Sequence, residues 1–593
     1  MKKRIIVLLI CFVSIISLAN SQSNAINNAL DQNTVLPQES IFVHFNASLF
    51  LAGENLYYKI YCLDKETNKL SALSRIAYVE LIGEDQKVVF KHKVTLESGA
   101  GYGDFIIPIS VNSGNYKLIA YTQWMKNEGI DSFFKSDISV INPFQSNQET
   151  ILFDKDIDLP NSDDSLLDLN TDNKLPSIIN SEFLEIETNK KTFQKRDKVL
   201  LTLKSKVDHN LAGNYSISVT KIDALDRLAS KVPSSNIYKN LKRNKNQNLK
   251  KVNYLPELRG ELISGRLLSA IDNKPVPNKK VAISIQQNDF ILKISKTNQE
   301  GVFYFNLNED YGKENAVLQI LGRNNKDYKI VLDEHTLLDY SNLDFGTFKI
   351  SPNYKNVLEK RSIYNQIENG YFYLKPNTLK QIDTIQPFFE DYFATFYLDD
   401  YTRFTKIQET FVEVISDAYI KRDHSQKFNF YVTSLDPYEQ LEKPAGVIVD
   451  GVLLQNFDEL IDYDSRRIKR ISIARTNTNL IFGSNIFGGL IVIETIDGKF
   501  FDELKSDNLT QVTLFKPQPK KAYFKKMYTT NNTFSRIPDY RSQLLWEPNV
   551  YMESNKEEFA FFTSDNAGQY EIRIEGYTVA GNPVSVRDYI IVN

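Results

Sequence analysis

Side chains that could carry out chemistry are present in this sequence, but they are not grouped into a recognisable site. The histidines are far apart and form neither a metal-binding nor a nucleophile-activating pattern: His44, His92, His209, His335 and His424. The adjacent acids Asp163-Asp164 and Asp399-Asp400 would point to opposite faces of a strand, which does not suit acid–base catalysis. We therefore predict a protein that is not an enzyme, with no catalytic residue, no metal and no cofactor. A hydrolase with a dispersed site stays open as an alternative.

One acidic stretch comes close to a calcium loop without completing it. Asp154, Asp156 and Asp158 have the alternate spacing of such a loop. However, Leu159 stands where an EF-hand needs glycine, and Ser165 stands where it needs a bidentate glutamate. We interpret residues 146–180 as a solvated acidic linker.

The composition and the first residues predict an exported chain. The formal net charge is −3 with both signs interspersed, which favours neither nucleic acid nor an anionic membrane as partner. Basic residues, the apolar run Ile5–Ala19 and a small-x-small motif ending at Ser21 predict a signal peptide over residues 1–21. No later run is apolar enough for a transmembrane segment in the mature chain. Cys11 lacks the small preceding residue of a lipid anchor, and Cys62 alone remains after cleavage, so no internal disulfide is expected.

The sharpest structural pattern lies between residues 444 and 498. The apolar runs Val447–Val449 and Val452–Leu454 flank Asp450-Gly451, which predicts a hairpin because a type I′ turn needs positive φ at both central residues. Gly488-Gly489 precede the apolar run Leu490–Ile493, a strand predicted to be buried on both faces. We expect residues 355–440 and the tail after 500 to cover this strand. Two helices are predicted from capping boxes, formed by Asn456 with Glu459 and by Thr405 with Gln408.

This stretch resembles the plug domain of TonB-dependent outer-membrane receptors, above all the SusC-like kind. The matching pieces are the hairpin, the strand Ile468–Ile473, the turn Phe482-Gly483-Ser484 and the strand Gly488–Thr495. The resemblance implies structural roles for Asp450, Gly451, Gly483, Gly488, Gly489 and Gly498. A receptor surrounds its plug with a barrel of about 22 strands, each of about 9–11 residues. The residues after Gly498 are too few for such a barrel, so we expect no transport by this chain alone. An unrelated small α+β domain is the alternative.

Residues 38–145 resemble the macroglobulin-type (MG) sandwich domains of the alpha-2-macroglobulin superfamily. The resemblance rests on L-A-G-E at 51–54, G-A-G-Y-G-D-F at 99–105 and G-N-Y-K-L-I-A-Y at 114–121. The covalent trap of that superfamily needs a thioester, and no Gly-Cys-Gly-Glu-Gln motif occurs. The glycines at 99, 101 and 103 have no following helix, so they do not predict a dinucleotide site.

Residues 258–335 resemble the carboxypeptidase regulatory-like domain, a transthyretin-like sandwich without zinc ligands. The matching phrases include I-S-G-R-L at 263–267 and T-N-Q-E-G-V-F-Y-F at 297–305. The predicted fold is therefore mainly β, with several Ig/MG-like and transthyretin-like β-sandwiches followed by a small α+β plug-like domain. The predicted segments are a signal peptide (1–21), an MG-like sandwich (38–145), an acidic linker (146–180), a second sandwich with a basic loop (181–257), a carboxypeptidase regulatory-like sandwich (258–335), a plug-like domain (355–505) and a β-rich C-terminal domain (506–593).

The combination resembles a family of barrel-less bacterial envelope proteins that join MG-like and plug-like domains. Y-L-D-D-Y-T-R-F at 397–404 and I-P-D-Y-R at 537–541 belong to that resemblance and carry no established chemical role. It implies an exported scaffold or accessory binding component of a transport or export assembly, on the periplasmic face or the surface of the outer membrane. The expected partners are outer-membrane or periplasmic proteins, and not nucleic acid. A surface-exposed adhesin, or a secreted cargo with a C-terminal sorting domain, is the alternative.

Overall fold

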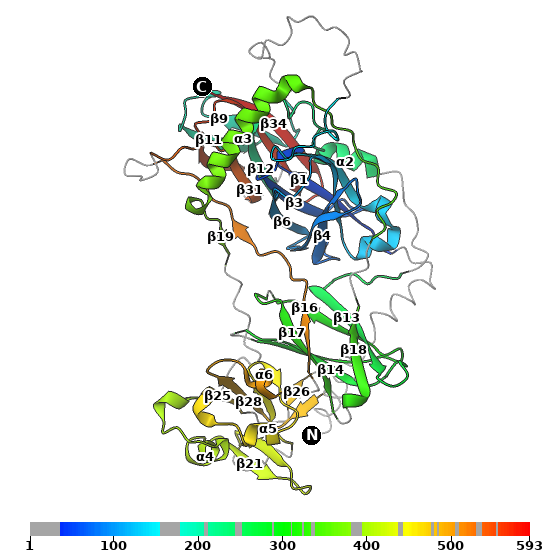
Figure 1. The fold of residues 1–593 in the computed structure, drawn as a ribbon, viewed down its shortest axis with the longest axis vertical. Coiled ribbons are helices and arrows are strands. Elements are labelled where there is room, and N and C mark those ends of the chain that lie inside the picture. The colour runs from blue at the N-terminus through cyan, green and yellow to red at the C-terminus, as the bar shows by residue number, and fades with distance from the viewer. Residues whose placement is uncertain are drawn as a thin grey trace, which may run out of the picture. The chain divides into compact units, whose positions relative to one another are not determined.

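The computed structural model divides the chain into two units (Figure 1). Unit 1 consists of residues 1–258, 338–380 and 517–593, and unit 2 consists of residues 259–337 and 381–516. The structure describes residues 36–153, 178–206, 212–242, 252–287, 290–309, 311–322, 325–333, 338–380, 394–436, 443–475, 480–482, 485–504, 509–528, 536–552 and 555–593. The predicted signal peptide, the three aspartates of the linker, and Gly483 lie outside these residues.

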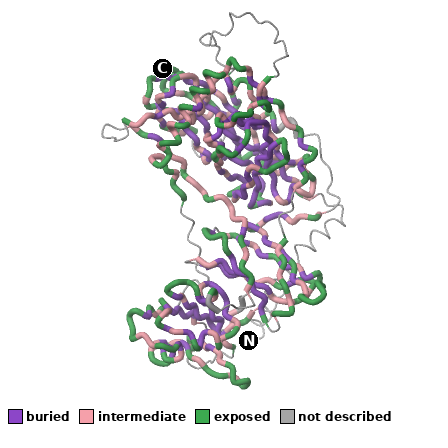
Figure 2. Tube along the Cα trace, viewed as in Figure 1, coloured by how far each residue is buried: buried purple, intermediate pink, exposed green. Residues whose placement is uncertain are grey.

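Strands are the main regular structure of the described residues, well ahead of helices, and they form several sandwich-like pairs of sheets. This confirms the predicted mainly β fold class. Buried residues concentrate in the sheets of each unit (Figure 2).

The first sandwich of unit 1 occupies the region that resembles MG domains. One sheet has the order β1 (Glu39–Phe45), β3 (Asn55–Asp64) and β6 (Ala100–Ile106). The other has the order β2 (Leu49–Leu51), β8 (Phe134–Ile141), β7 (Gly114–Tyr121), β4 (Ile76–Gly83) and β5 (Val88–Thr95). Two short 3-10 helices, η1 (Trp124–Glu128) and η2 (Ile130–Ser132), separate β7 from β8.

Two of the three spaced glycines of the sequence lie within β6. A Cβ atom on Gly101 would lie 2.6 Å from the carbonyl oxygen of Thr95, and one on Gly103 would meet the ring of Tyr58. These glycines therefore allow close packing between strands.

The second sandwich of unit 1 combines strands from distant parts of the chain. Its larger sheet has the order β10 (Thr192–Phe193), β34 (Pro583–Val592), β33 (Gly568–Thr578), β12 (Gly213–Ile222) and β31 (Gln543–Met552). Its smaller sheet has the order β32 (Lys556–Phe562), β11 (Lys198–Ser205) and β9 (Leu184–Thr188). The sequence predicts separate domains over 181–257 and 506–593, whereas their strands share both sheets and one core.

Helical segments and short strands complete unit 1. They are α2 (Ser235–Lys242), η5 (Pro352–Tyr354), α3 (Lys355–Gly370), η6 (Phe372–Leu374), and the strand pair β19 (Thr378–Leu379) and β30 (Lys521–Ala522). Only Ser362 is buried among the residues of α3. Val357 and Leu358, both half-buried, pack against a small apolar cluster that includes Leu49 and Leu51.

Unit 2 begins with the sandwich predicted over residues 258–335. One sheet has the order β16 (Val302–Leu307), β13 (Glu261–Ser269) and β18 (Tyr328–Leu332), and η4 (Asn325–Asp327) precedes β18. The other has the order β15 (Ile291–Lys296), β14 (Lys280–Ile285), β17 (Asn315–Leu321) and β29 (Leu509–Thr513). The last strand, β29, comes from the region predicted as the start of the C-terminal domain.

The rest of unit 2 is a small α+β domain around a mixed sheet. The order is β20 (Ala394–Tyr397), β25 (Ile468–Ala474), β28 (Leu490–Thr495), β23 (Gly446–Val449) and β24 (Val452–Leu453), with β23 and β28 parallel. The hairpins are β21 (Ala418–Arg422) with β22 (Phe428–Val432), and β26 (Leu480–Phe482) with β27 (Asn485–Phe487). The helical segments are η7 (Leu398–Asp400), α4 (Ile407–Glu413), α5 (Asp458–Ile461), η8 (Ser465–Arg467) and α6 (Phe500–Leu504).

Strand β28 is buried on both faces by two different structures. Ile491 and Ile493 belong to a cluster with residues of α4, α5, α6 and the β21–β22 hairpin, which lie in the regions expected to cover them. Val492 instead packs with Ile448 and with Phe290 and Leu292 of the preceding sandwich. The expectation that residues 355–440 and the tail after 500 cover this strand therefore holds for the face of Ile491 and Ile493 and is wrong for the face of Val492.

Both predicted capping boxes are wrong in detail. Helix α4 begins one residue later than the Thr405 box implies, and its capping box joins Lys406 with Glu409. Before α5, Asn456 makes no side-chain cap to the backbone; its amide contacts the side chain of Glu459 instead. A one-residue shift in the start of a helix exchanges the residues available for capping.

Candidate functional site

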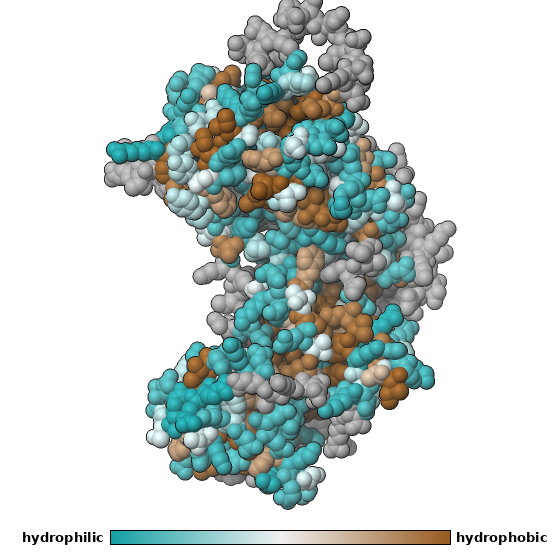
Figure 3. Space-filling model, viewed as in Figure 1, coloured by the Kyte–Doolittle hydropathy of each residue, from teal (hydrophilic) through white to brown (hydrophobic). Residues whose placement is uncertain are grey.

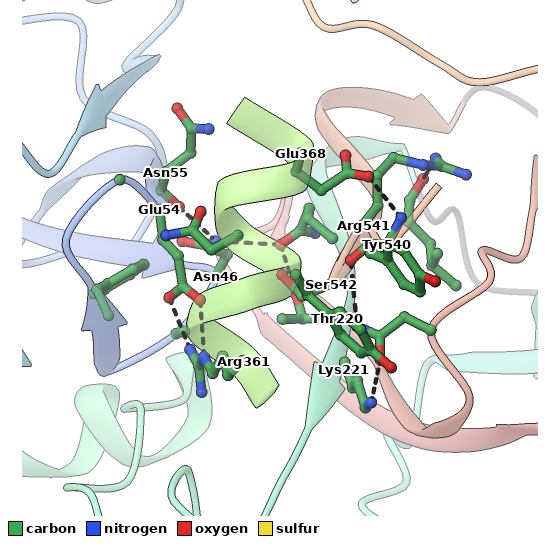
Figure 4. A pocket seen from close by; sticks show the side chains of 18 of the residues that line it. Asn46, Glu54, Asn55, Thr220, Lys221, Arg361, Glu368, Tyr540, Arg541 and Ser542 are labelled. Carbon is green, nitrogen blue, oxygen red and sulfur yellow. Dashed lines mark hydrogen bonds and ion pairs between the residues drawn. The ribbon is translucent and has the colours of Figure 1, made fainter. Parts of the chain in front are cut away.

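A cavity of about 520 Å3 lies within unit 1 (Figure 4). Its wall is built from four stretches of the chain: residues 46–57, 220–226, 356–377 and 523–566. Helix α3 supplies one side of this wall, and the ends of β3, β12 and β31 supply the others. A volume of this size is in the range of small-molecule pockets, roughly 300–1,000 Å3.

Arg361 of α3 ties the helix to the sandwiches by ion pairs. Its Nε and Nη2 atoms each donate to Glu54 at 2.8 Å, and Nη1 donates to Asp226 at 3.0 Å and to Asp223 at 3.2 Å. Burial raises the pKa of Asp226 above its ordinary value, against the opposing effect of Arg361. Burial acts in the same direction on Asp223, but Arg361 and backbone N–H donors hold the pKa of that carboxyl below its ordinary value.

Amide side chains join α3 to the loop before β3. Asn365 donates to the carbonyl oxygen of Ala52 at 2.8 Å, and Asn369 donates to that of Gly53 at 3.2 Å. Gly53 has a φ of +93°, and a Cβ atom there would lie 2.7 Å from the Asn369 amide nitrogen. Glycine is therefore required for this helix to approach the loop.

The I-P-D-Y-R phrase at 537–541 forms another part of the wall. The ring of Tyr540 stacks on Tyr364 of α3 with centroids 4.1 Å apart, and its backbone N–H donates to Glu368 at 2.6 Å (Figure 4). Arg541 donates to the buried Asp539 at 2.7 and 2.8 Å, and Asp539 also accepts from the Tyr528 hydroxyl. The I-P-D-Y-R phrase, to which the sequence analysis assigned no role, therefore helps to position the cavity wall.

The lysines of the wall have different surroundings. Lys375 pairs with Glu368, and Lys221 donates to the amide oxygen of Asn566. Burial, followed by repulsion from Lys360, lowers the pKa of Lys221 to about 8. Lys360 is exposed and lies over the Tyr364 ring, 5.7 Å from its centroid.

A serine–histidine contact elsewhere in unit 1 does not have the geometry of a nucleophile. Ser216 Oγ lies 2.6 Å from His44 Nδ1, but both side chains are fully buried. The other ring nitrogen, Nε2, accepts from Arg573 rather than facing a carboxylate, and burial holds the pKa of His44 well below its ordinary value. This pair joins the two sandwiches, because His44 lies in β1 and Ser216 in β12. Among the residues that the structure describes, no three histidine, cysteine, aspartate or glutamate side chains are placed to hold a metal ion.

The residues singled out by the plug resemblance belong to unit 2 and are not among the residues that line the cavity. Asp450 and Gly451 have φ values of 47° and 82°, and the Asp450 carboxylate accepts from the N–H and hydroxyl of Thr495 at 2.8 and 2.7 Å. Gly488 donates to the carbonyl oxygen of Pro444. Gly489 and Gly498 have φ values of 97° and 67°. These residues shape turns of the α+β domain.

Sequence reasoning missed the cavity because its lining has no local motif. Residues from four stretches meet only after the strands have paired. The available signal was the I-P-D-Y-R phrase, which places a charged pair and a tyrosine close together in the sequence. In the structure its Tyr540 bonds to Glu368 of α3, and its Arg541 pairs with the buried Asp539.

Comparisons with known proteins leave the family of this chain open. No protein-family model matches the chain, and no curated protein matches it. Among solved structures, a mutant Salmonella alpha-2-macroglobulin aligns over 93% of this chain and 39% of its own length, at 8% identity and a TM-score of 0.23. Escherichia coli alpha-2-macroglobulin activated by porcine elastase aligns over 94% and 44%, at 10% identity and a TM-score of 0.23. The chain thus spans less than half the length of these neighbours, and TM-scores this low assign neither a domain nor a site.

The surface and the helices add two further observations. Apolar side chains reach the viewed surface of unit 1 in separate groups set among polar residues (Figure 3). Across the described ranges, no helix has both the length and the apolar character needed to cross a membrane.

Proposed function

We propose that this chain is an exported, non-enzymatic binding protein associated with the outer membrane of a Gram-negative bacterium. In this role it serves as a scaffold or accessory component of a transport or export assembly and takes a ligand into the cavity of unit 1. Its partners are outer-membrane or periplasmic proteins. The proposal includes the signal peptide predicted from the sequence. It also includes the assignment of MG-like, carboxypeptidase regulatory-like and plug-like domains from their sequence resemblances.

The observation that carries the proposal is the state of the charges around the cavity. Arg361, Lys375 and Arg541 each pair with a carboxylate inside the protein. Paired charges hold the wall in shape, and these three cations are not free to act as a base or nucleophile. A preformed pocket whose charged wall residues are already paired within the protein is suited to ligand binding.

The test compares two serine-to-tryptophan variants of the full chain. Ser542 lines the cavity, and Ser542→Trp should fill it; Ser146 is exposed in the same unit, and Ser146→Trp is the matched control. Each variant is expressed in a Gram-negative host, fractionated, and used for affinity capture from solubilised outer membranes. We expect the wild type and both variants in the outer-membrane fraction. We also expect that Ser542→Trp, and not Ser146→Trp, fails to capture at least one component that the wild type captures.

Two results would overturn the proposal. One is retention of the protein in the cytoplasm. The other is an unchanged set of captured components with a folded Ser542→Trp variant, since the cavity would then have no part in binding.

A further inference from the structure

Several of the groups that remain available in the cavity are neutral, beside the exposed cation Lys360. The hydroxyls of Tyr57, Tyr364, Tyr540 and Ser542 and the side-chain amide of Asn55 line it, and none makes a hydrogen bond to another of the described residues. Burial raises the pKa of Tyr57, so this phenol stays protonated at neutral pH. Hydroxyls both donate and accept hydrogen bonds, and an amide does the same with two different atoms. A ligand that matches them must also carry groups that donate and accept.

The charged groups of the lining argue against a charged ligand. Arg361, Lys375 and Arg541 are neutralised by carboxylates, and Lys221 is held by an amide oxygen. An anion at Arg361, Lys375 or Arg541 would have to displace the carboxylate that already pairs with that cation, and the displaced carboxylate would lose its partner. The exposed Lys360 lies over the Tyr364 ring, so acidic oligosaccharides are included in the test. A neutral ligand leaves all of these pairs intact.

The aromatic side chains supply the apolar part of the site. The aromatic residues that line the cavity are Phe50, Tyr57, Tyr364, Phe372, Tyr523, Phe524, Tyr540 and Trp546. Phe372 is 47% exposed although it is large and apolar, and it lies at the end of α3, where a ligand could cover it. Aromatic rings pack well against C–H groups, and a sugar ring presents a C–H face together with hydroxyls around its edge.

An extended peptide fits this site less well. Peptides bind at open sheet edges through main-chain hydrogen bonds. The edge strand at the cavity is β31, and its carbonyl oxygens at Leu544 and Leu545 already accept from the side chains of Arg541 (3.4 Å) and Gln543 (2.6 Å). Strands β3 and β12, which also reach the cavity, have neighbours on both sides.

We infer that the cavity binds a short, neutral carbohydrate. The sugar ring stacks on the aromatic wall, and its hydroxyls exchange hydrogen bonds with the tyrosine, serine and asparagine side chains. This inference rests on the proposed function, because it names the ligand class of the same site.

The experiment uses the full mature chain on an array of neutral and acidic oligosaccharides, with calorimetric titration of any disaccharide that binds. A capped neutral tetrapeptide is the competing probe. Tyr364→Phe and Tyr540→Phe remove one hydroxyl each and keep both rings. Tyr373→Phe is the matched control, since Tyr373 is 74% exposed and is not part of the lining. We expect saturable binding of a neutral oligosaccharide, weakened about threefold to tenfold by each cavity variant, in line with the loss of one hydrogen bond, and unchanged by the control.

Three outcomes would overturn the inference: no neutral oligosaccharide binds, the peptide or acidic sugars bind in preference, or the two cavity variants bind like the control. If Ser542→Trp still abolishes capture of an outer-membrane component in that case, the ligand class is wrong and the binding role stands. If Ser542→Trp also leaves capture unaffected, both the ligand class and the proposed binding role of the cavity are refuted.

Discussion

Replacement of Arg361 by methionine tests how α3 is held. Arg361 is 15% exposed and contacts three carboxylates whose side chains are 12–20% exposed, so its removal leaves three acids together with no cation. Breaking a buried charge pair from one side costs about 3–5 kcal/mol. Because all four groups keep some contact with solvent, we expect the lower end, about 3 kcal/mol of the stability of unit 1.

The pH dependence of this loss gives a second measurement. Arg361 lowers the pKa of both Asp223 and Asp226, so in Arg361→Met both pKa values rise above those of the wild type. The native variant then binds more protons than its unfolded chain, and its stability increases as the pH falls. The difference between wild type and variant should therefore be largest near pH 8 and smaller near pH 5.

The assay is urea unfolding followed by tryptophan fluorescence. The chain has 2 tryptophans, and both, Trp124 and Trp546, lie in unit 1, so this signal reports that unit alone. Lys87→Met is the control, because its pair with Asp85 is exposed and its loss should leave the transition unchanged. A loss below about 1 kcal/mol for Arg361→Met, or the same loss at both pH values, would refute this account of the helix.

Three further predictions concern other parts of the chain. Gly451→Val should destabilise the α+β domain by about 1–2 kcal/mol or more, because φ is positive and the new Cβ would lie 2.8 Å from Phe290 Cβ. Amide hydrogen exchange should accelerate over residues 447–493. A similar acceleration throughout unit 1 would contradict the division into units. Phe290→Ala should lower the stability of unit 2 by about 3 kcal/mol, because Phe290 packs against Val492 and Ile448. Circular dichroism during urea unfolding measures this loss. An unaltered transition would show that the sandwich does not support β28. Reductant should leave the melting temperature unchanged, since Cys62 is buried in β3 and forms no disulfide with another of the described residues. A sharp fall at low protein concentration would refute this.

Features encoded by neighbouring residues could be predicted from the sequence, and features encoded by distant ones could not. The Asp450-Gly451 turn needs only its own two residues and their flanking apolar runs, and the structure has positive φ at both positions. The burial of Leu490–Ile493 likewise follows from composition, but the identity of the covering residues does not. Phe290 and Leu292 reach Val492 from a different domain of the same unit, and no periodicity records that contact.

The candidate site shows the same limit more strongly. Tyr364 and Tyr540 stack face to face over a separation of 176 residues in the chain, and Thr220 bonds to Gln543 over a separation of 323 residues. Such contacts exist only once β12 has paired with β31, which is a property of the complete sheet. Prediction of separate domains over 181–257 and 506–593 failed for this reason.

The position of β12 between β31 and β33 also determines when unit 1 can become stable during synthesis. Its two partners emerge more than 300 residues after it, so β12 leaves the ribosome with both edges open. Both stretches of unit 2 are made in that interval and can fold first, since domains generally fold as units in the order of synthesis. Unpaired edges of this kind promote aggregation, so holdase chaperones should associate with chains that end before residue 543 and release chains that extend through β33 and β34.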